Sequence, residues 1–212
     1  MSSFEEKLDR RVEHFDTSGR TLIASVVGLA YEYDLPVGLE YISHDAATRP
    51  INFETRGESV RGILVAIVHQ LPDYRVSFLN GMVDIYVPKA REDPSNLLNK
   101  VIKDFSATES DTHDAALQLS CALTHELEPS NGCGGSVALG QWGTLKITVH
   151  MQNAKVYEIL NAIVAQNGNA IWTVVAPPKK LSGMQFGGLW HIYPLQPPFK
   201  DVVLDRLTGM DQ

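Results

Sequence analysis

Polar and apolar positions along the first half of the chain follow two periods, one typical of helices and one typical of strands. Apolar residues recur every three or four positions over Thr21–Asp34 and Val60–Leu71, which predicts two helices with one buried face each. Ser59 is the expected N-cap of the second helix, because a serine side chain accepts hydrogen bonds from first-turn amides. Asn80-Gly81 predicts a tight hairpin, since both residues readily adopt positive φ. Short apolar or alternating stretches predict strands at Arg11–Asp16, Val37–Ile42, Ile51–Glu54, Tyr74–Phe78 and Val83–Val87.

The second half of the chain repeats this pattern. Ile51–Phe78 and Ile147–Val174 align without a gap at a constant offset of 96 residues, with identical residues at eight positions. Farther on, Gly81–Tyr86 recurs as Gly188–Tyr193 at an offset of 107, which indicates an insertion of 11 residues in the second copy. The second copy is therefore predicted to hold helices at Asp111–Leu127 and Lys155–Gln166 and strands at Lys100–Ser106, Ser136–Leu139, Leu145–Val149, Ala170–Val175 and Leu189–Tyr193.

The repeat predicts an α+β fold made of two β-α-β-β-α-β-β units, with helices packed on small mixed sheets. The first unit spans residues 1–92. The second spans residues 93–194 and is degenerate, with longer loops around its Gly- and Pro-rich segments. Residues 195–212 are predicted to form a tail or a short docking helix.

Composition excludes several classes of protein. With 44% hydrophobic residues and a net charge of -7 over 212 residues, the chain is too apolar and too weakly charged for intrinsic disorder. The excess of acidic residues disfavours nucleic acid as a partner. No apolar run approaches the length that spans a bilayer, so no membrane insertion is expected. The first residues show no basic segment followed by an apolar stretch, so no export signal is predicted.

The first unit resembles a known family of small α/β modules. The resemblance rests on Phe15-Asp16-Thr17, the helix Leu22–Tyr33, Leu35–Glu40, Ile51-Asn52-Phe53, the helix Ser59–Leu71, Tyr74-Arg75-Val76 and Val83–Val87. In order and size these segments resemble the short secretin and TonB N-terminus domain, the STN domain, and the second unit fits the same pattern more loosely. The resemblance implies a non-catalytic periplasmic adaptor that binds other proteins through strand edges and helix faces, without a cofactor. The alternative location, given the absence of a visible signal peptide, is the cytoplasm.

A candidate partner surface follows from where arginine and aromatic residues gather. Eight of the nine arginines precede residue 95, and the closing strands of both units carry aromatics. Arginine, tyrosine and tryptophan are the residue types that most often anchor interfaces. The alternatives are scattered solvated positions for the arginines and core positions for the aromatics. The candidate residues are Arg49, Arg56, Arg61, Arg75, Tyr74, Tyr86, Trp172 and Trp190.

The two cysteines suggest other chemistry. Cys121 and His125 stand four residues apart on one predicted helix, a spacing that suits a zinc site completed by Cys133 and His113. The same pair suits a thiol nucleophile, with amides of the Gly132–Gly135 loop as an oxyanion hole. In an oxidising compartment the two cysteines would instead pair. These residues have no counterparts in the first unit, so no catalytic, metal or cofactor site is predicted.

The sequence thus predicts an adaptor of the bacterial cell envelope that binds another protein by strand-edge pairing, or a homo-oligomer formed in the same way. Two alternatives stay open. One is a small enzyme that uses Cys121, His125 and the glycine loop, and the other is a structural subunit of an envelope assembly.

Overall fold

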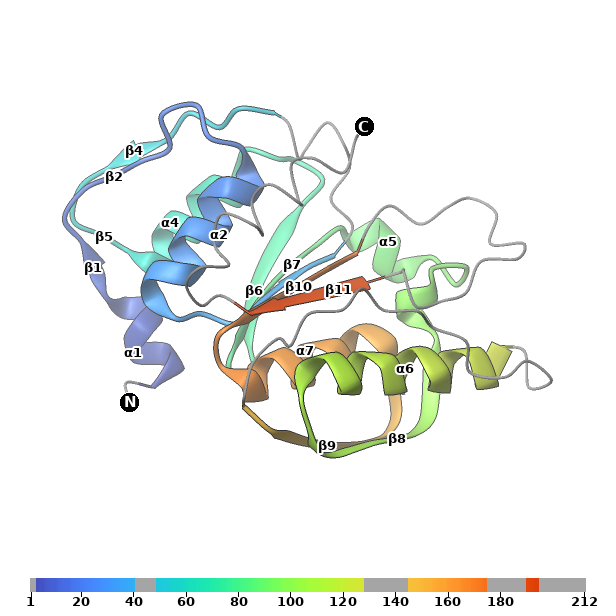
Figure 1. Cartoon of the computed structure of the whole chain (residues 1–212). Helices are drawn as coiled ribbons and strands as arrows, with labels where there is room; N and C mark the ends of the chain where they lie inside the picture. Colours follow the sequence, from blue (N-terminus) through green and yellow to red (C-terminus); the bar gives the residue numbers. More distant parts are fainter. Residues whose placement is uncertain (1–2, 41–48, 128–144, 175–189, 195–212) are drawn as a thin grey trace.

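The structure, a computed structural model, describes residues 3–40, 49–127, 145–174 and 190–194 (Figure 1). Within β11 only the side chain of Ile192 is described. The helices are α1 (Phe4–Asp9), α2 (Leu22–Tyr33), α4 (Val60–His69), α5 (Pro88–Glu92), α6 (Thr112–Leu127) and α7 (Val156–Asn167), with a 3-10 turn at Leu97–Asn99. The strands are β1 (Arg11–Val12), β2 (Phe15–Asp16), β3 (Val37–Leu39), β4 (Glu54–Thr55), β5 (Glu58–Ser59), β6 (Arg75–Leu79), β7 (Met82–Tyr86), β8 (Val101–Ser110), β9 (Ile147–Lys155), β10 (Ala170–Val174) and β11 (Trp190–Pro194).

A five-stranded mixed sheet with the order β11-β10-β3-β7-β6 lies at the centre of the molecule. β3 runs parallel to both of its neighbours, β7 and β10, whereas the two outer pairs are antiparallel hairpins. Strands from before and after residue 93 therefore share one sheet. The predicted boundary between residues 92 and 93 does not separate two sheets, because β3 joins β10 directly.

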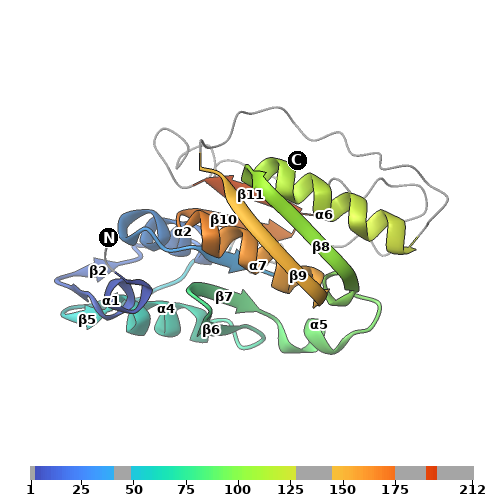
Figure 2. The ribbon, with the colours of Figure 1, turned by 90° about the horizontal axis from the view of Figure 1, so that it is seen from below.

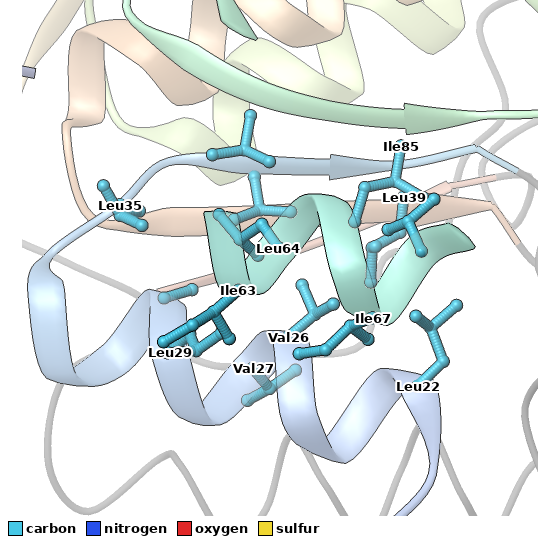
Figure 3. Close-up of a cluster of buried hydrophobic side chains, with 14 of the residues drawn as sticks. Leu22, Val26, Val27, Leu29, Leu35, Leu39, Ile63, Leu64, Ile67 and Ile85 are labelled. Carbon is cyan, nitrogen blue, oxygen red and sulfur yellow. The ribbon is translucent and has the colours of Figure 1, made fainter. Parts of the chain in front are cut away.

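Helices cover the two faces of this sheet, and each face has its own hydrophobic core. α2 and α4 lie on one face and α6 and α7 on the other (Figure 1). Because side chains alternate along a strand, Val83 and Ile85 of β7 enter the α2–α4 core, while Met82 enters the α6–α7 core. Figure 3 shows the first core, in which leucine, isoleucine and valine side chains of α2 and α4 meet those of β3 and β7.

Two-stranded ribbons lie outside the helices. In the first, β1 pairs antiparallel with β5, and β2 pairs antiparallel with β4. In the second, β8 pairs antiparallel with β9, and this ribbon crosses over α7 (Figure 2). The two ribbons have matching registers: Phe15 faces Thr55 in the first, and Phe105 faces Met151 in the second. Phe105 follows Phe15 by 90 residues, and Met151 follows Thr55 by 96 residues. The value of 96 is also the offset of the sequence alignment.

The α+β class is confirmed, and so are the local signals that predicted the helices. The Ser59 hydroxyl accepts a hydrogen bond from the Gly62 amide at 3.1 Å, as expected of an N-cap. Asn80 and Gly81 both have positive φ, +54° and +79°, which is the conformation of the predicted hairpin turn. The apolar face predicted for each helix is buried, through Leu22, Val26, Leu29, Ala30 and Tyr33 in α2 and Val60, Ile63, Leu64, Ile67 and Val68 in α4.

Several strand boundaries differ from the prediction. Arg11–Asp16 forms two short strands, because Gly57 opposite adopts a φ of +67° and donates its amide hydrogen to the Val12 carbonyl. Ile51 is buried but lies outside any strand, since its amide bonds to the Arg20 carbonyl at 2.8 Å. β8 and β9 are longer than predicted, because their solvent-facing positions are polar and hide the strand pattern. The predictions at Ser136–Leu139 and 195–212 lie outside the described residues.

Candidate functional site

A cluster of charged side chains is buried where β3, β7 and α5 meet. Arg91 of α5 bonds both oxygens of Glu40, with Nε at 2.9 and 3.1 Å, and also bonds Asp84 through Nη2. The Glu40 and Asp84 side chains are 1% and 7% exposed, and that of Arg91 is 20% exposed. Two buried carboxylates thus share a single guanidinium, whose planar shape allows it to bond both.

Local chain geometry brings these residues together. Glu40 directly follows β3, and its amide bonds the Ile85 carbonyl of the parallel strand β7 at 2.8 Å. Arg91 lies in α5, which begins at Pro88 two residues after β7 ends, so its side chain reaches back over the strand. Two tyrosine rings enclose it: the guanidinium carbon is 3.6 Å from the centroid of the Tyr86 ring and 4.4 Å from that of Tyr157.

Burial shifts the pKa values of the residues in this cluster. Desolvation raises the pKa of Glu40 to about 7 although the bonds and the charge of Arg91 oppose the shift. Desolvation also raises the pKa of Asp84, against the Arg91 charge and the nearby Asn161 amide. The pKa of Arg91 is raised, because the two carboxylates outweigh its own burial. One guanidinium does not compensate fully for two carboxylates removed from water.

The raised pKa of Glu40 predicts an unusual pH dependence of stability. Between the unfolded value of 4.5 and the folded value of about 7, the native state holds a proton that the unfolded chain has lost. The contribution of Glu40 to the free energy of unfolding is therefore present at acidic pH and falls as pH rises through this window, by up to about 3 kcal/mol. Glu40→Gln should make the slope shallower by the contribution of Glu40 and leave that of Asp84, whose pKa is also raised, and urea titrations at pH 5 and pH 8 would measure the difference. Asp104→Asn, at an exposed site of β8, should keep the wild-type slope. A Glu40→Gln slope equal to that of wild type would contradict the prediction.

Next to the cluster, β3 approaches α7 and β10 closely. A Cβ atom on Gly38 would lie 2.7 Å from Nε1 of Trp172 and 3.0 Å from Oδ1 of Asn161, so this position needs glycine. In the space left by Gly38, Trp172 donates a hydrogen bond to Asn161 at 2.7 Å. Trp172 is completely buried, and the hydrogen bond satisfies its indole nitrogen.

A groove of about 510 Å³ opens beside the charged cluster. β6 and β7 form one wall, and α7 and β9 form the other. Asp84 reaches it, and among the described residues the Oδ1 atom of Asp84 has no hydrogen-bond partner. Both polar and apolar side chains line the groove, among them Ser77, Leu79, Met82, Asp84, Met151, Tyr157, Glu158, Asn161 and Ala162.

β6 lies at one edge of the central sheet, and no other described strand pairs with its outer side. In its hairpin with β7, Leu79 faces Met82 across a two-residue turn, so the alternate residues Val76 and Phe78 direct their backbone N–H and C=O groups outward. Ser77 and Leu79 direct their side chains to the groove, and Leu79 is 66% exposed. The open backbone of β6 and the groove are therefore adjacent.

The arginines of the predicted partner surface are dispersed. Arg61 of α4 bonds Glu5 and lies 3.5 Å from Asp9, which fastens α1 to α4. Arg75 donates hydrogen bonds to the carbonyls of Pro72 and Tyr74 at 2.8 and 2.6 Å. Arg49 and Arg56 are exposed. Arg61 and Arg75 thus have structural contacts of their own, and the structure does not bring the four arginines into one cluster with a shared ligand.

The aromatic residues of that surface separate into core and groove positions. Trp172 is 0% and Tyr74 5% exposed, so the partner-surface hypothesis does not hold for them: β10 is an inner strand covered by α7, and Tyr74 belongs to the α2–α4 core. Tyr86 is half-buried and stacks on Arg91. Trp190 lies in β11, and its side chain is outside the described residues.

The structure bears on the chemistry that the two cysteines suggested. Cys121 on α6 is disulfide-bonded, so it carries no thiolate in this structure. Cys133 and the Gly132–Gly135 loop lie outside the described residues. Within the described ranges no group of three or more histidine, cysteine or acidic residues is arranged to hold a metal ion.

Among those same residues, no helix has the length and apolar character needed to cross a bilayer.

The charged cluster was not predicted from the sequence. Glu40 and Asp84 sit in or beside apolar strands, VGLE and MVDIY, and a lone carboxylate in such a run is the signal that was available. Arg91 follows within seven residues of Asp84. A charged residue in a buried strand requires a partner, so these three residues could have been grouped.

The described residues define an α+β protein with a central mixed sheet, a buried carboxylate–guanidinium cluster and a groove beside an open strand edge. No family model, curated protein or solved structure matches the chain.

Proposed function

We propose that this protein is a non-catalytic adaptor that binds an extended segment of another protein along β6. The segment would add a sixth strand to the central sheet and place alternate side chains in the groove. The observation that carries the proposal is the adjacency of the outward backbone groups of Val76 and Phe78 to the groove lined by Ser77 and Leu79. Backbone pairing supplies affinity in such complexes, and the groove supplies selectivity.

Other features support a place in the cell envelope. The disulfide at Cys121 fits an oxidising compartment such as the periplasm. The resemblance of residues 15–87 to STN domains implies the same location and an adaptor role. The matching registers of the two ribbons support duplication of one unit, as in tandem binding modules.

Strand addition can be tested by removing one outward amide. Val76→Pro deletes an N–H that points away from β7, and an edge strand tolerates proline at such a position. With a photo-crosslinking residue at Leu79 of the whole chain in its native host, we expect a specific cross-linked partner. Val76→Pro should lower its yield at least tenfold, because the partner loses a ladder hydrogen bond and clashes with the ring. The measurement is the cross-linked band, identified by mass spectrometry.

Two controls sharpen this experiment. The same cross-linker at Val101 on β8, which is 48% exposed, should not capture that partner. Circular dichroism and the unfolding midpoint should show that Val76→Pro is folded. A partner captured with equal yield by the wild-type chain and by the Val76→Pro variant would contradict strand addition. Capture of a second copy of this chain would contradict the adaptor role and favour a structural subunit.

A further inference from the structure

We infer that the groove recognises a lysine side chain, whose ammonium group bonds Asp84 Oδ1. That the lysine belongs to an extended segment of another protein rests on the proposed function. That the groove recognises a lysine side chain rests on the groove itself. The Asp84 side chain is 7% exposed, and Oδ2 accepts from Arg91. Within the described part of the chain Oδ1 has no donor in hydrogen-bonding geometry, although the Asn161 amide lies near enough to lower the pKa of the carboxyl. A buried carboxylate oxygen without a donor is costly, and a ligand cation would satisfy it.

The charges around the groove favour a cation. Among the described residues that line the groove, Asp84 and Glu158 are acidic and Arg91 is basic, and Arg91 is also bonded to the buried Glu40 behind it. The donors of Arg91 are directed at Glu40 and Asp84, and Tyr86 and Tyr157 stack on its guanidinium. Its charge is therefore largely engaged by the carboxylates beside it.

The shape of the acceptor favours an ammonium over a guanidinium. A guanidinium binds a carboxylate best through two oxygens, but Arg91 already occupies Oδ2 of Asp84. A single remaining oxygen suits the point charge of an ammonium group. Ser77 is the cross-strand neighbour of Asp84 and also lines the groove, so its hydroxyl is a second acceptor.

The apolar part of the groove suits the stem of a lysine. Leu79, Met151 and Ala162 line it together with the polar residues. A lysine side chain buries its four methylene groups against apolar surface while its charged end reaches a polar group. A segment paired with β6 would direct alternate side chains to the same face as Ser77 and Leu79.

Binding can be tested on the whole chain with a small probe. We expect Nα-acetyl-lysine N-methylamide to cause saturable amide NMR shifts at Ser77, Asp84 and Asn161. Nα-acetyl-norleucine N-methylamide, which has the same stem without the ammonium, should bind at least tenfold more weakly. Asp84→Asn should abolish the preference, and Asp104→Asn should keep it. Equal binding of the two probes, or no shifts at these amides, would overturn the inference.

A second experiment supplies the ammonium from within the chain. Ser77→Lys places it beside Asp84, and Ser77→Met places an uncharged side chain of similar size there. The lysine variant should have the higher unfolding midpoint, and the difference should disappear in an Asp84→Asn background. If Asp84→Asn does not fold, the comparison of the two Ser77 variants decides alone, and no advantage for lysine overturns the inference.

The outcomes separate this inference from the proposed function. Probe binding at Asp84 without a partner that depends on the Val76 amide would contradict strand addition and leave lysine recognition standing. A Val76-dependent partner without a preference for the lysine probe would contradict lysine recognition alone.

Discussion

Replacing Arg91 with alanine is expected to lower the free energy of unfolding by about 3–5 kcal/mol at pH 8, the range for breaking a buried ion pair. The substitution leaves Glu40 and Asp84 buried without their shared cation. The loss should be smaller at pH 5, because the carboxylates can then be neutral. Urea unfolding at both pH values measures the difference. The stability of Arg91→Lys should lie between that of wild type and that of Arg91→Ala, since an ammonium keeps the charge but loses the bidentate bond and the stacking on tyrosine.

Arg61 offers a matched control for the Arg91 prediction. It also contacts two carboxylates and an aromatic ring, but its acidic partners Glu5 and Asp9 are mostly exposed. Arg61→Ala should therefore cost about 1 kcal/mol or less. Combining Arg91→Met with Glu40→Gln and Asp84→Asn should recover much of the loss, because no unpaired charge then remains. Equal losses for Arg61→Ala and Arg91→Ala, or no recovery in the triple variant, would show that Arg91 does not act by compensating buried charge.

Helices were predictable here because their determinants are local. The N-cap at Ser59, the apolar face of α4 and the stop before Pro72 all lie within one short segment. The hairpin at Asn80-Gly81 was predictable for the same reason. The ribbon strands were harder to predict. β8 and β9 carry polar residues on their exposed faces, and they are stabilised as strands by pairing with each other.

The arrangement of the sheet required non-local information. β3 pairs with β10 more than 130 residues away, and no local pattern distinguishes this from pairing within each predicted unit. The same pairing explains why Trp172 is in the core: its position on a closing strand suggested an edge, but β10 is an inner strand. The carboxylate cluster escaped prediction because its three members become neighbours only once β3, β7 and α5 are assembled.

Trp172→Ala should produce the other large loss, about 3–5 kcal/mol, as expected for removal of a large aromatic side chain from a core. Trp172 is completely buried between β10 and α7, and its indole donates to Asn161. Thermal or urea unfolding at one pH measures the loss. Val101→Ala at an exposed position of β8 is the control and should change stability by less than about 0.5 kcal/mol. A loss below about 1 kcal/mol for Trp172→Ala would contradict its place in the core.

The same tryptophan should determine what Gly38 tolerates. Gly38→Ala places a Cβ atom 2.7 Å from Nε1 and 2.9 Å from Cε2 of Trp172, so we expect a loss of about 1–3 kcal/mol from overpacking. Trp172→Phe removes the indole nitrogen from this contact. Gly38→Ala should therefore cost less in the Trp172→Phe background, with a coupling of about 1 kcal/mol or more in the double-mutant cycle. Additive losses would mean that the indole nitrogen of Trp172 is not what requires glycine here, and would leave the contact with Asn161 Oδ1 as the reason.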